Sequence, residues 1–299
     1  MKIMLNTLFS TDNVITAENQ QETRKVDNFY ISGFCAGEMS CSVIKQSRPY
    51  GSGFSYSPDL TVSNEDLILL RKVNASLCDG RGVISAIHGG YNLSMRGKKK
   101  VALALSFLTR YPIIAGDIAN AKITLLKQAM FILSEKGKST RRNMSEVETV
   151  ERIRANLKLL KKEGLSVTQM TFHKRRYSRK ELGYFLCGIF DAEGSIGLKR
   201  CDKWFQLYFA VGMKDRGIID LFQLYFGFGN ICERKNEKLY LFETAKRANV
   251  ALLLRKFFQE FPSKLEKNII KIHRLNRILN DYTRNGKDLP IYYNDGHLW

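Results

Sequence analysis

The 299-residue chain is poor in the residues that build metal-bound or disulfide-linked folds. It has six cysteines, none of them in a C-x-x-C pair, and four histidines that stand alone. Scattered cysteines in a chain of this length are typical of free thiols in a reducing compartment. The spacing of cysteine and histidine excludes a zinc finger and a histidine-ligated nuclease metal.

Long apolar runs are also lacking. The longest, residues 101–107 and 251–254, are far shorter than the ~18 residues that span a bilayer. The first thirty residues carry acidic side chains and have no apolar segment followed by a small-residue cleavage site. We therefore expect neither a membrane segment nor a secretory signal.

Acidic residues are in short supply, because 29 Asp and Glu stand against 48 Lys and Arg, for a formal net charge of +19. This excess favours a polyanionic partner, since lysine and arginine release counterions from a phosphate backbone. A merely basic surface, as in a ribosomal protein, fits the charge equally well. Hydrophobic residues at 44% exclude a disordered chain and allow one large domain or two smaller ones.

The chain contains an internal repeat. Residues 29–45 (FYISGFCAGEMSCSVIK) align without a gap with residues 184–200 (YFLCGIFDAEGSIGLKR), which pairs Glu38 with Glu193. The segments that follow match in kind: two strand-like stretches, an apolar helix, two short strands and further helix. We predict a duplication in which each half runs helix–strand–strand–helix–strand–strand–helix.

A basic segment separates the repeats. Residues 136–180 contain 14 Lys and Arg against 4 Glu. Ser145 and Glu148 have the spacing of a capping box, which predicts an amphipathic helix running to about Lys162. Such a helix is either a connector packed on one half or a basic surface for a nucleic-acid backbone, and the sequence leaves both open.

Small residues recur four apart in both repeats, which lets two helices approach closely because the ridge of side chains is missing. The pairs are Ser32 with Ala36, Gly33 with Gly37, and Gly188 with Ala192. Close packing would bring Glu38 and Glu193 together at the negative ends of two helix dipoles. Two like charges ~4 Å apart repel by about 4 kcal/mol at an effective dielectric of about 20. Divalent cations would reverse the sign of this interaction, and oxygen ligands suit Mg²⁺.

The second repeat, LCGIFDAEG at residues 186–194, resembles the motif that names the LAGLIDADG homing endonucleases. The first, ISGFCAGEM at residues 31–39, is similar but more diverged. A Tyr-Pro or Phe-Pro pair before a helix, at Tyr111 and Phe261, also recurs in that family. The resemblance covers about residues 28–281.

The resemblance implies an α+β fold of two pseudo-symmetric αββαββα halves, whose antiparallel sheets form a saddle for the DNA major groove around centrally packed motif helices. It also implies that the last acid of each motif, Glu38 and Glu193, ligates Mg²⁺, aided by the carbonyls of Gly37 and Ala192. Two or three ions would be shared between the halves, with Mn²⁺ as a substitute. We divide the chain into an N-terminal extension, a first half, a basic helical linker, a second half and a C-terminal tail, at residues 1–27, 28–135, 136–180, 181–281 and 282–299.

The chain departs from the family pattern at several positions. Ala36 replaces the acid usual at the sixth motif position, which is tolerable because that residue is not the main ligand. Met39 stands where glycine is usual, at a cost of about 1 kcal/mol if the position is left-handed. The family often has a basic residue after the fourth strand that polarises the catalytic water, and Lys267 fits that place whereas Asp117 occupies it in the first half. These departures favour an impaired first active site.

Strands after the two acids supply candidate base-reading residues, because side chains alternate between the two faces of a strand. The predicted DNA-binding set is Ser42, Ile44, Gln46 and Arg48 in the first half, and Lys199, Cys201, Lys203, Gln206 and Tyr208 in the second. Glutamine suits adenine edges, and arginine or lysine suits guanine. Plain surface polarity is the alternative at each position. In the first half, Phe54, Tyr56, Leu60 and Val62 are predicted to be buried.

We therefore predict a site-specific, Mg²⁺-dependent double-strand DNA endonuclease, intron-encoded, monomeric by duplication and without a membrane partner. The alternative is an RNA-binding maturase that assists splicing of a group I intron. A third reading is a nucleic-acid binder whose catalysis has decayed. Both glutamates favour the enzyme, whereas Met39 and Asp117 favour the alternatives. Because such genes occur in mitochondria, chloroplasts and prokaryotes, we expect an organelle or the prokaryotic cytoplasm.

Overall fold

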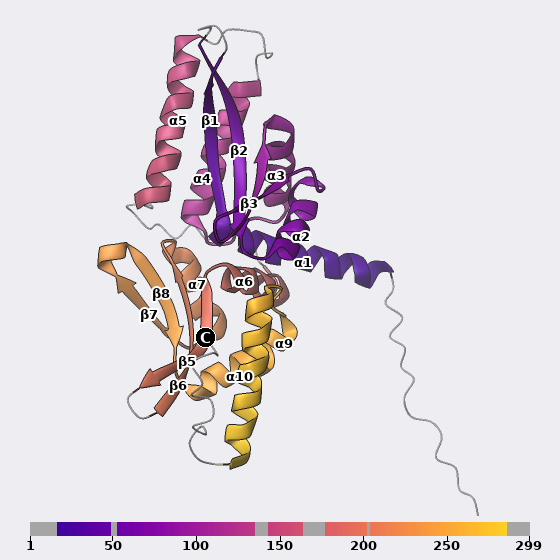
Figure 1. Ribbon diagram of the computed structural model, residues 1–299, viewed down its shortest axis with the longest axis vertical. Coiled ribbons are helices and arrows are strands. Elements are labelled where there is room, and N and C mark those ends of the chain that lie inside the picture. The colour runs from indigo at the N-terminus through magenta and orange to yellow at the C-terminus, as the bar shows by residue number, and fades with distance from the viewer. Residues whose placement is uncertain (1–16, 49–52, 135–142, 164–176, 202–203, 286–299) are drawn as a thin grey trace, which may run out of the picture.

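The computed structural model describes residues 17–48, 53–134, 143–163, 177–201 and 204–285. The first half of the described chain has this order of elements: α1 (Ala17–Glu38), β1 (Met39–Ser47), β2 (Phe54–Asn64), α2 (Leu67–Cys78), β3 (Val83–Ile87), β4 (Gly90–Arg96), α3 (Lys98–Arg110) and α4 (Asp117–Ser134). Helix α5 (Met144–Glu163) connects it to the second half (Figure 1).

The second half repeats this order and ends in a longer set of helical segments. Its elements are α6 (Arg179–Glu193), β5 (Gly194–Cys201), β6 (Trp204–Met213), α7 (Arg216–Phe226), β7 (Asn230–Arg234), a 3₁₀ turn (Lys235–Glu237), β8 (Leu239–Thr244), α8 (Arg247–Leu252), a π-helical turn (Leu253–Phe257), α9 (Phe258–Glu260) and α10 (Glu266–Asn285). No helix in the described parts of the chain is long and apolar enough to cross a membrane.

Each half contains one four-stranded antiparallel sheet, and the two sheets have the same strand order. The orders are β1-β2-β4-β3 and β5-β6-β8-β7. In Figure 1 the two halves lie end to end and meet at α1 and α6. The predicted α+β fold of two αββαββα halves, with the motif helices packed between them, is confirmed.

The strands alternate between a buried face and an open face. Cys41, Val43, Leu60 and Val62 are all 5% exposed or less and face the helices of their own half. Phe54 was expected in this buried row, and that prediction is wrong, because its side chain is 51% exposed. It lies at the outer end of the hairpin, where the Lys45 ammonium covers its ring at 3.9 Å from the centroid.

Helix α5 is a packed connector with a solvent-facing basic side. Its apolar residues Val150, Ile153 and Leu157 are buried against α4 and β1. The predicted capping box at Ser145 and Glu148 is wrong. The cap lies two residues earlier, where Asn143 accepts from the Glu146 backbone N–H at 2.8 Å and donates its own backbone N–H to the Glu146 carboxylate.

Polar contacts fix α5 to the first sheet. Arg154 donates from Nε to the backbone oxygen of Val43 at 2.9 Å, which satisfies a carbonyl on the outer strand β1. Glu151 pairs with Lys45 at 2.7 Å and accepts from the Tyr56 hydroxyl at 2.7 Å. This covered edge is protected from pairing with another chain, a hazard that exposed edge strands carry.

Candidate active site and nucleic-acid interface

Glycine lets the two motif helices α1 and α6 pack backbone to backbone. A Cβ placed on Gly33 would overlap the carbonyl oxygen of Phe185, and one placed on Gly188 would overlap that of Tyr30. At Gly37 a Cβ would lie 2.6 Å from the Cβ of Ala192. The small residues of the repeat therefore permit the approach that brings the ends of the two helices together.

Gly33→Ala and Gly188→Ala are each expected to lower the free energy of unfolding by about 3 kcal/mol, because neither overlapping carbonyl can move without shifting a helix. Urea unfolding followed by circular dichroism measures this. Gly212→Ala is the matched control, since its new Cβ would make ordinary contacts at 3.6 Å or more. Equal stability of Gly33→Ala and Gly212→Ala would contradict the packing argument.

The two acids stand where each motif helix becomes a strand. Glu38 ends α1 and Glu193 ends α6, and β1 and β5 begin at the next residue. The first residue of β5, Gly194, has φ −89° and is extended, and Met39 is not among the described residues with positive φ. Met39 therefore does not carry the strain of a left-handed backbone, and it does not count against an active first site.

The Glu38 and Glu193 carboxylates are neighbours where the two motif helices end, and Glu38 is half-buried whereas Glu193 is exposed. Protein atoms packed around Glu193 raise its pKa to about 7 even though solvent reaches the side chain, and the charge of Glu38 adds to the rise. Burial also raises the pKa of Glu38, while Asn64 and Lys267 partly oppose the shift. Two adjacent carboxylates of this kind concentrate negative charge where the two helices end.

Replacing Glu193 with Gln is expected to stabilise the metal-free protein at alkaline pH. An acid whose folded pKa is raised contributes stability below its unfolded pKa near 4.5, and this is lost as the pH rises through about 7. Urea unfolding with EDTA should show Glu193→Gln more stable than the parent at pH 8 by roughly 1–2 kcal/mol, a figure discounted for solvent access, and unchanged at about pH 3.5, below the unfolded pKa. The exposed Glu233→Gln is the control, and equal pH slopes of parent and Glu193→Gln would contradict the argument.

The donor set fits a hard cation that is held jointly with other oxygen ligands. Across the described ranges of the chain, no group of three or more His, Cys, Asp or Glu side chains is placed to hold a metal. Two carboxylates together with the free carbonyls that end each helix suit Mg²⁺, which keeps several waters and commonly shares its ligands with substrate phosphates. Glu38, Glu193 and the carbonyls of Gly37 and Ala192 could therefore hold such an ion beside a phosphodiester.

Lys267 lies beside Glu38, in the other half. It lies in the first turn of α10 and pairs with Glu65 at 2.8 Å, and its charge opposes the rise in the pKa of Glu38. Asn64 donates from Nδ2 to Oε1 of Glu38 at 2.9 Å. The sequence reasoning missed Asn64 and Glu65. Their position at the end of β2, antiparallel to the strand that starts after Glu38, is the signal that could have revealed them.

The acid at the sixth motif position is structural. Asp191 is 3% exposed and accepts five hydrogen bonds, which come from the Tyr30 hydroxyl, Ser263 Oγ, Asn268 Nδ2 and the backbone N–H groups of Lys264 and Leu265. In the first half, where Ala36 has no carboxylate, Asp215 accepts from the Asp117 and Ile118 backbone N–H groups at 3.1 and 2.9 Å. Asp215 occupies the place of Asp66, which likewise accepts from the Glu266 backbone N–H at the start of α10, at 3.3 Å. This cap is therefore common to both halves, and it does not stand in for the carboxylate that Ala36 lacks.

The predicted base-reading residues share the open face of each sheet. Ser42, Ile44 and Gln46 alternate with the buried residues of β1, and their exposure increases toward its outer end. On β5 and β6, Ser195 and Tyr208 hydroxyls lie 3.0 Å apart, and Cys201 contacts Gln206, so both strands present one surface.

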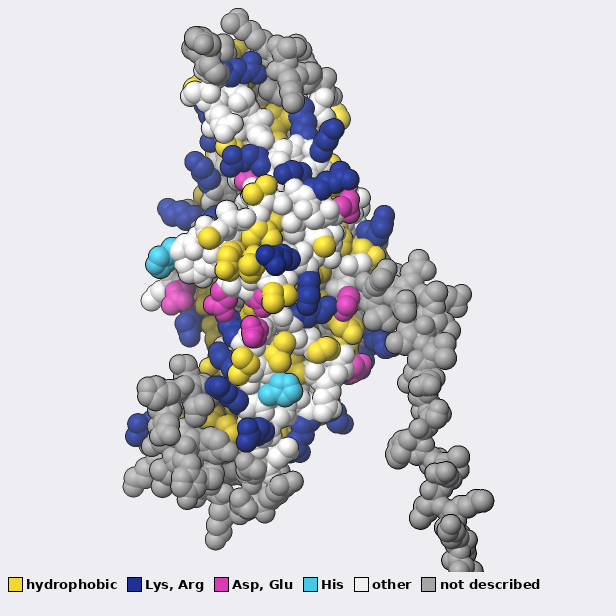
Figure 2. Space-filling model, turned by 45° about the vertical axis from the view of Figure 1, so that its right-hand side comes forward, with side chains coloured by type: hydrophobic (Ala, Val, Ile, Leu, Met, Phe, Trp, Pro, Cys, Tyr) yellow, Lys and Arg dark blue, Asp and Glu magenta, His cyan; other side chains and the backbone are white. Residues whose placement is uncertain are grey.

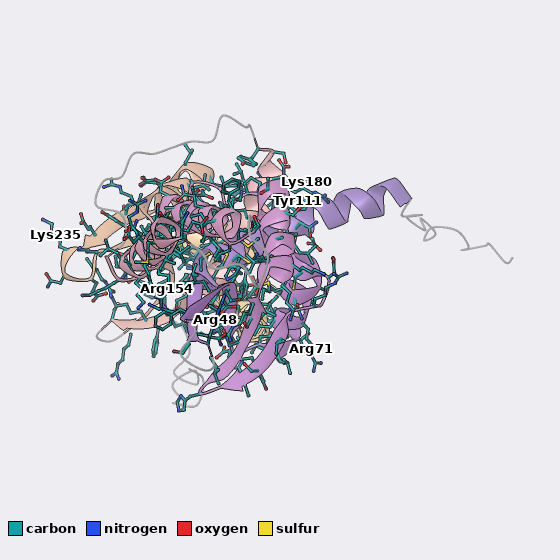
Figure 3. All side chains as sticks on the ribbon, turned by 90° about the horizontal axis from the view of Figure 1, so that it is seen from above. Arg48, Arg71, Tyr111, Arg154, Lys180 and Lys235 are labelled. Carbon is teal, nitrogen blue, oxygen red and sulfur yellow. The ribbon has the colours of Figure 1, made fainter. Side chains whose placement is uncertain are left out.

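The remaining members of this set and their neighbours complete the surface. Lys199 is exposed, Arg48 follows β1, and Lys203 lies outside the described residues. Strand β4 adds Asn92, which accepts from Ser63, and Ser94, which donates to Asp59. The sequence reasoning predicted a strand here but named none of its residues for base reading. In Figure 2, Lys and Arg side chains are spread over both halves while acidic ones gather in the middle zone, and Lys235 projects at the outer edge of the second half in Figure 3.

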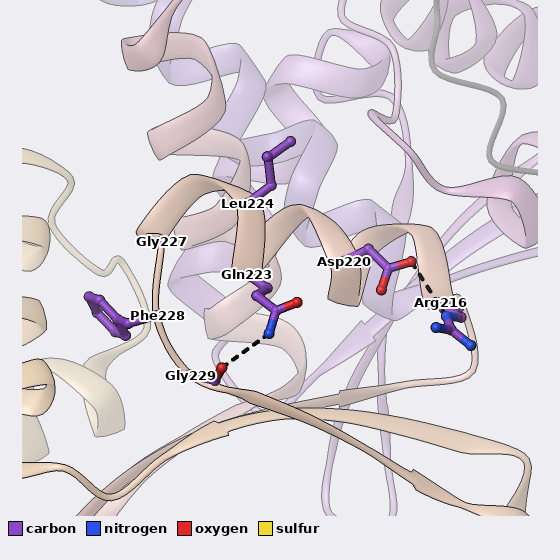
Figure 4. Close-up of a pocket in the computed structure, with 7 residues that line it drawn as sticks. All are labelled: Arg216, Asp220, Gln223, Leu224, Gly227, Phe228 and Gly229. Atoms are coloured by element: carbon purple, nitrogen blue, oxygen red, sulfur yellow. Dashed lines mark hydrogen bonds and ion pairs between the residues drawn. The ribbon is translucent and has the colours of Figure 1, made fainter.

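An open hollow of about 650 Å³ lies elsewhere, along α7 and the turn that follows it (Figure 4). Its lining residues are Arg216, Asp220, Gln223, Leu224, Gly227, Phe228 and Gly229. Arg216 pairs with Asp220 at 3.5 Å, and Gln223 donates to the carbonyl of Gly229 at 3.1 Å. Because its polar groups satisfy one another, we assign no chemistry to this hollow.

Comparison with solved structures identifies the architecture. The DNA complex of the LAGLIDADG homing endonuclease I-GzeII superposes with a TM-score of 0.70 at 17% identity, covering 91% of this chain and 92% of that one. The chain has the fold of the LAGLIDADG homing endonucleases. The meganuclease I-AabMI bound to uncleaved DNA gives 0.69 at 18% identity over 88% and 93%, and the target-bound homing endonuclease I-LtrWI gives 0.69 at 16% over 87% and 92%.

In comparisons of sequence, no family model and no curated protein matches the chain. The LAGLIDADG fold is therefore visible in the backbone, where identities of 14–18% accompany these superpositions. Within that fold, the acids Glu38 and Glu193 end the two central helices, and the open sheet faces extend away on either side.

Proposed function

We propose that this protein is a site-specific double-strand DNA endonuclease, encoded within an intron, that uses divalent metal ions to hydrolyse one phosphodiester in each strand and leaves short 3′ overhangs. The observation that carries the proposal is the meeting of Glu38 and Glu193 at the ends of two glycine-packed helices, between two open sheets. A pair of neighbouring like charges is unfavourable in a purely structural interface, and a cation bound with a phosphate would remove that cost.

The chain's own residues would divide the work between binding and chemistry. Mg²⁺, when bound, lowers the pKa of a water nucleophile and stabilises the leaving oxygen. Glu38 and Glu193 would hold the metal, Asn64 orients the Glu38 carboxylate, and Lys267 supplies a positive charge beside it. The open strand faces, with Gln46, Gln206 and Lys199 among their side chains, would read base edges, and the net charge of +19 would hold the backbone.

The direct test is cleavage of a plasmid that carries the rejoined exon sequence of the host gene. Mg²⁺ or Mn²⁺ should give a linear product with short 3′ extensions, and EDTA should prevent it. A plasmid with a scrambled site is the control. Failure to cut the rejoined-exon site in either metal ion would refute the proposal.

A second candidate function is that of an RNA-binding maturase for a group I intron. The observation in its favour is the basic side of α5, where Arg152, Lys158, Lys161 and Lys162 are exposed while the opposite side is buried. RNA would bind there through phosphate charge and shape. Splicing at limiting Mg²⁺ with a Glu38→Gln, Glu193→Gln double variant tests it, because maturase activity should survive in that protein while cleavage is lost.

A further inference from the structure

The two candidate centres occupy equivalent places in the two halves. Each acid is followed by a strand whose first residue pairs with Val62 in one half and with Val211 in the other. The residues two positions after these valines are therefore equivalent, and they are Asn64 and Met213. The pseudo-symmetry allows the surroundings of the two acids to be compared position by position.

The centre at Glu38 is built from polar groups that contact one another. The Asn64 amide donates to the Glu38 carboxylate at 2.9 Å, and the Asn64 oxygen accepts from the Asp66 backbone N–H at 3.0 Å, which fixes the amide in place. Glu65 holds the Lys267 ammonium at 2.8 Å. The carboxylate therefore has a hydrogen-bond donor and a neighbouring cation already in position.

Among the described residues, the centre at Glu193 has neither the hydrogen-bond donor nor the neighbouring cation. Met213 replaces the asparagine, and a thioether donates no hydrogen bond. Lys214 takes the place of Glu65 but donates to the carbonyl of Lys162 at the end of α5, at 2.9 Å. Within the described part of the chain, no side chain donates to the Glu193 carboxylate.

The position of the lysine is also changed at the Glu193 centre. Lys267 is the fifth residue after Pro262, and the fifth residue after Pro112 is Asp117. Each of the two positions that carry Glu65 and Lys267 at the first centre thus carries the opposite charge at the second. By this count, an acid has the sequence position in the first half that the cation Lys267 has in the second.

These differences bear on metal-assisted chemistry through the positioning of the ligand. A metal-binding carboxylate that is itself hydrogen-bonded is held in one orientation, and loss of such a partner commonly costs about 10–100-fold in metal affinity or activity. We propose that the two centres are unequal, and that the Glu38 centre cuts its DNA strand first, so that a nicked duplex precedes the double-strand break. The proposal rests on the proposed endonuclease function, and Asn64, Glu65 and Lys267 act in it as positioning residues.

The test uses a target duplex with a different fluorescent label on each strand, followed on denaturing gels. The parent protein should cut one strand at least about tenfold faster than the other. Lys267→Met should slow the fast strand by roughly 10–100-fold and leave the slow strand unchanged. Lys267 is 51% exposed, so this change is safe for folding, and Lys271→Met, one turn along the same helix, is the matched control.

A gain-of-function variant and a binding measurement complete the test. Met213→Asn should give the Glu193 carboxylate an amide donor and speed the slow strand by about tenfold. It should also increase the tightening of target binding by Ca²⁺, measured by fluorescence anisotropy without cleavage. The slow strand and the Ca²⁺ effect both remaining at parent values in Met213→Asn would overturn the proposal.

The possible failures are distinguishable. Absence of cleavage of either strand by the parent would refute the endonuclease function itself, and the inference with it. Equal rates on the two strands would overturn the inference alone, as would an equal slowing of both strands by Lys267→Met.

Discussion

Glu38→Gln and Glu193→Gln are each expected to lower the rate of double-strand cleavage by at least about 10³-fold. Each change removes one of the two carboxylates of the proposed metal site, and charge stabilisation by such an ion is worth several kcal/mol. Glutamine has almost the same shape as glutamate, so the helix ends and the open sheets should keep their form. Plasmid cleavage in Mg²⁺ measures the effect.

Target binding should respond differently from cleavage. Fluorescence anisotropy in EDTA is expected to show an affinity within about threefold of the parent, because the basic surface is untouched and removal of an acid near phosphate does not oppose binding. Glu233→Gln, an exposed change on β7, is the control and should cut normally. Cleavage at the parent rate by either active-site variant would remove that glutamate from the metal site.

The sequence predicted the central features well because they are local and repeated. One ungapped alignment pairs Glu38 with Glu193 and places both at the ends of glycine-bearing helices, and the strand alternation after each acid correctly placed Cys41 and Val43 in the core. Contacts that join the two halves are not encoded in any periodicity. Lys267 was assigned to the half that contains it, yet the partners it finds, Glu65 and Glu38, lie in the other half.

Two smaller errors have equally specific causes. Phe54 follows the apolar alternation of β2, but the strand extends beyond the helices that would cover it, so alternation alone overestimates burial. At α5 both Asn143–Glu146 and Ser145–Glu148 have capping-box spacing. The structure uses Asn143, which lies one residue before the helix begins, together with Glu146. Competition between adjacent caps is decided by packing, which Val150 and Ile153 supply.

Asp191→Ala is expected to cost about 3–5 kcal/mol in the free energy of unfolding, which is the largest effect on stability that we predict for one side chain. The carboxylate is 3% exposed and joins three elements, because it accepts from Tyr30 on α1, projects from α6 and receives the first N–H groups before α10. Its removal takes one acceptor from five donors, of which Ser263 Oγ keeps a second acceptor in the Leu265 carbonyl at 3.4 Å, and each donor left unpaired carries a desolvation penalty.

A graded series makes this prediction measurable even where Asp191→Ala fails to fold. Tyr30→Phe deletes one donor, whose hydrogen bond to the charged carboxylate is 2.6 Å long, and should cost about 1.5–3 kcal/mol. Asp220→Ala breaks a half-exposed pair with Arg216 at 3.5 Å and, as the control, should cost less than about 1 kcal/mol. Urea unfolding followed by circular dichroism ranks the three variants. Because Asp191 connects α1 to α6 and α10, its loss should destabilise both halves in one unfolding transition. If Tyr30→Phe lowers the free energy of unfolding no more than Asp220→Ala does, this network does not hold the halves together.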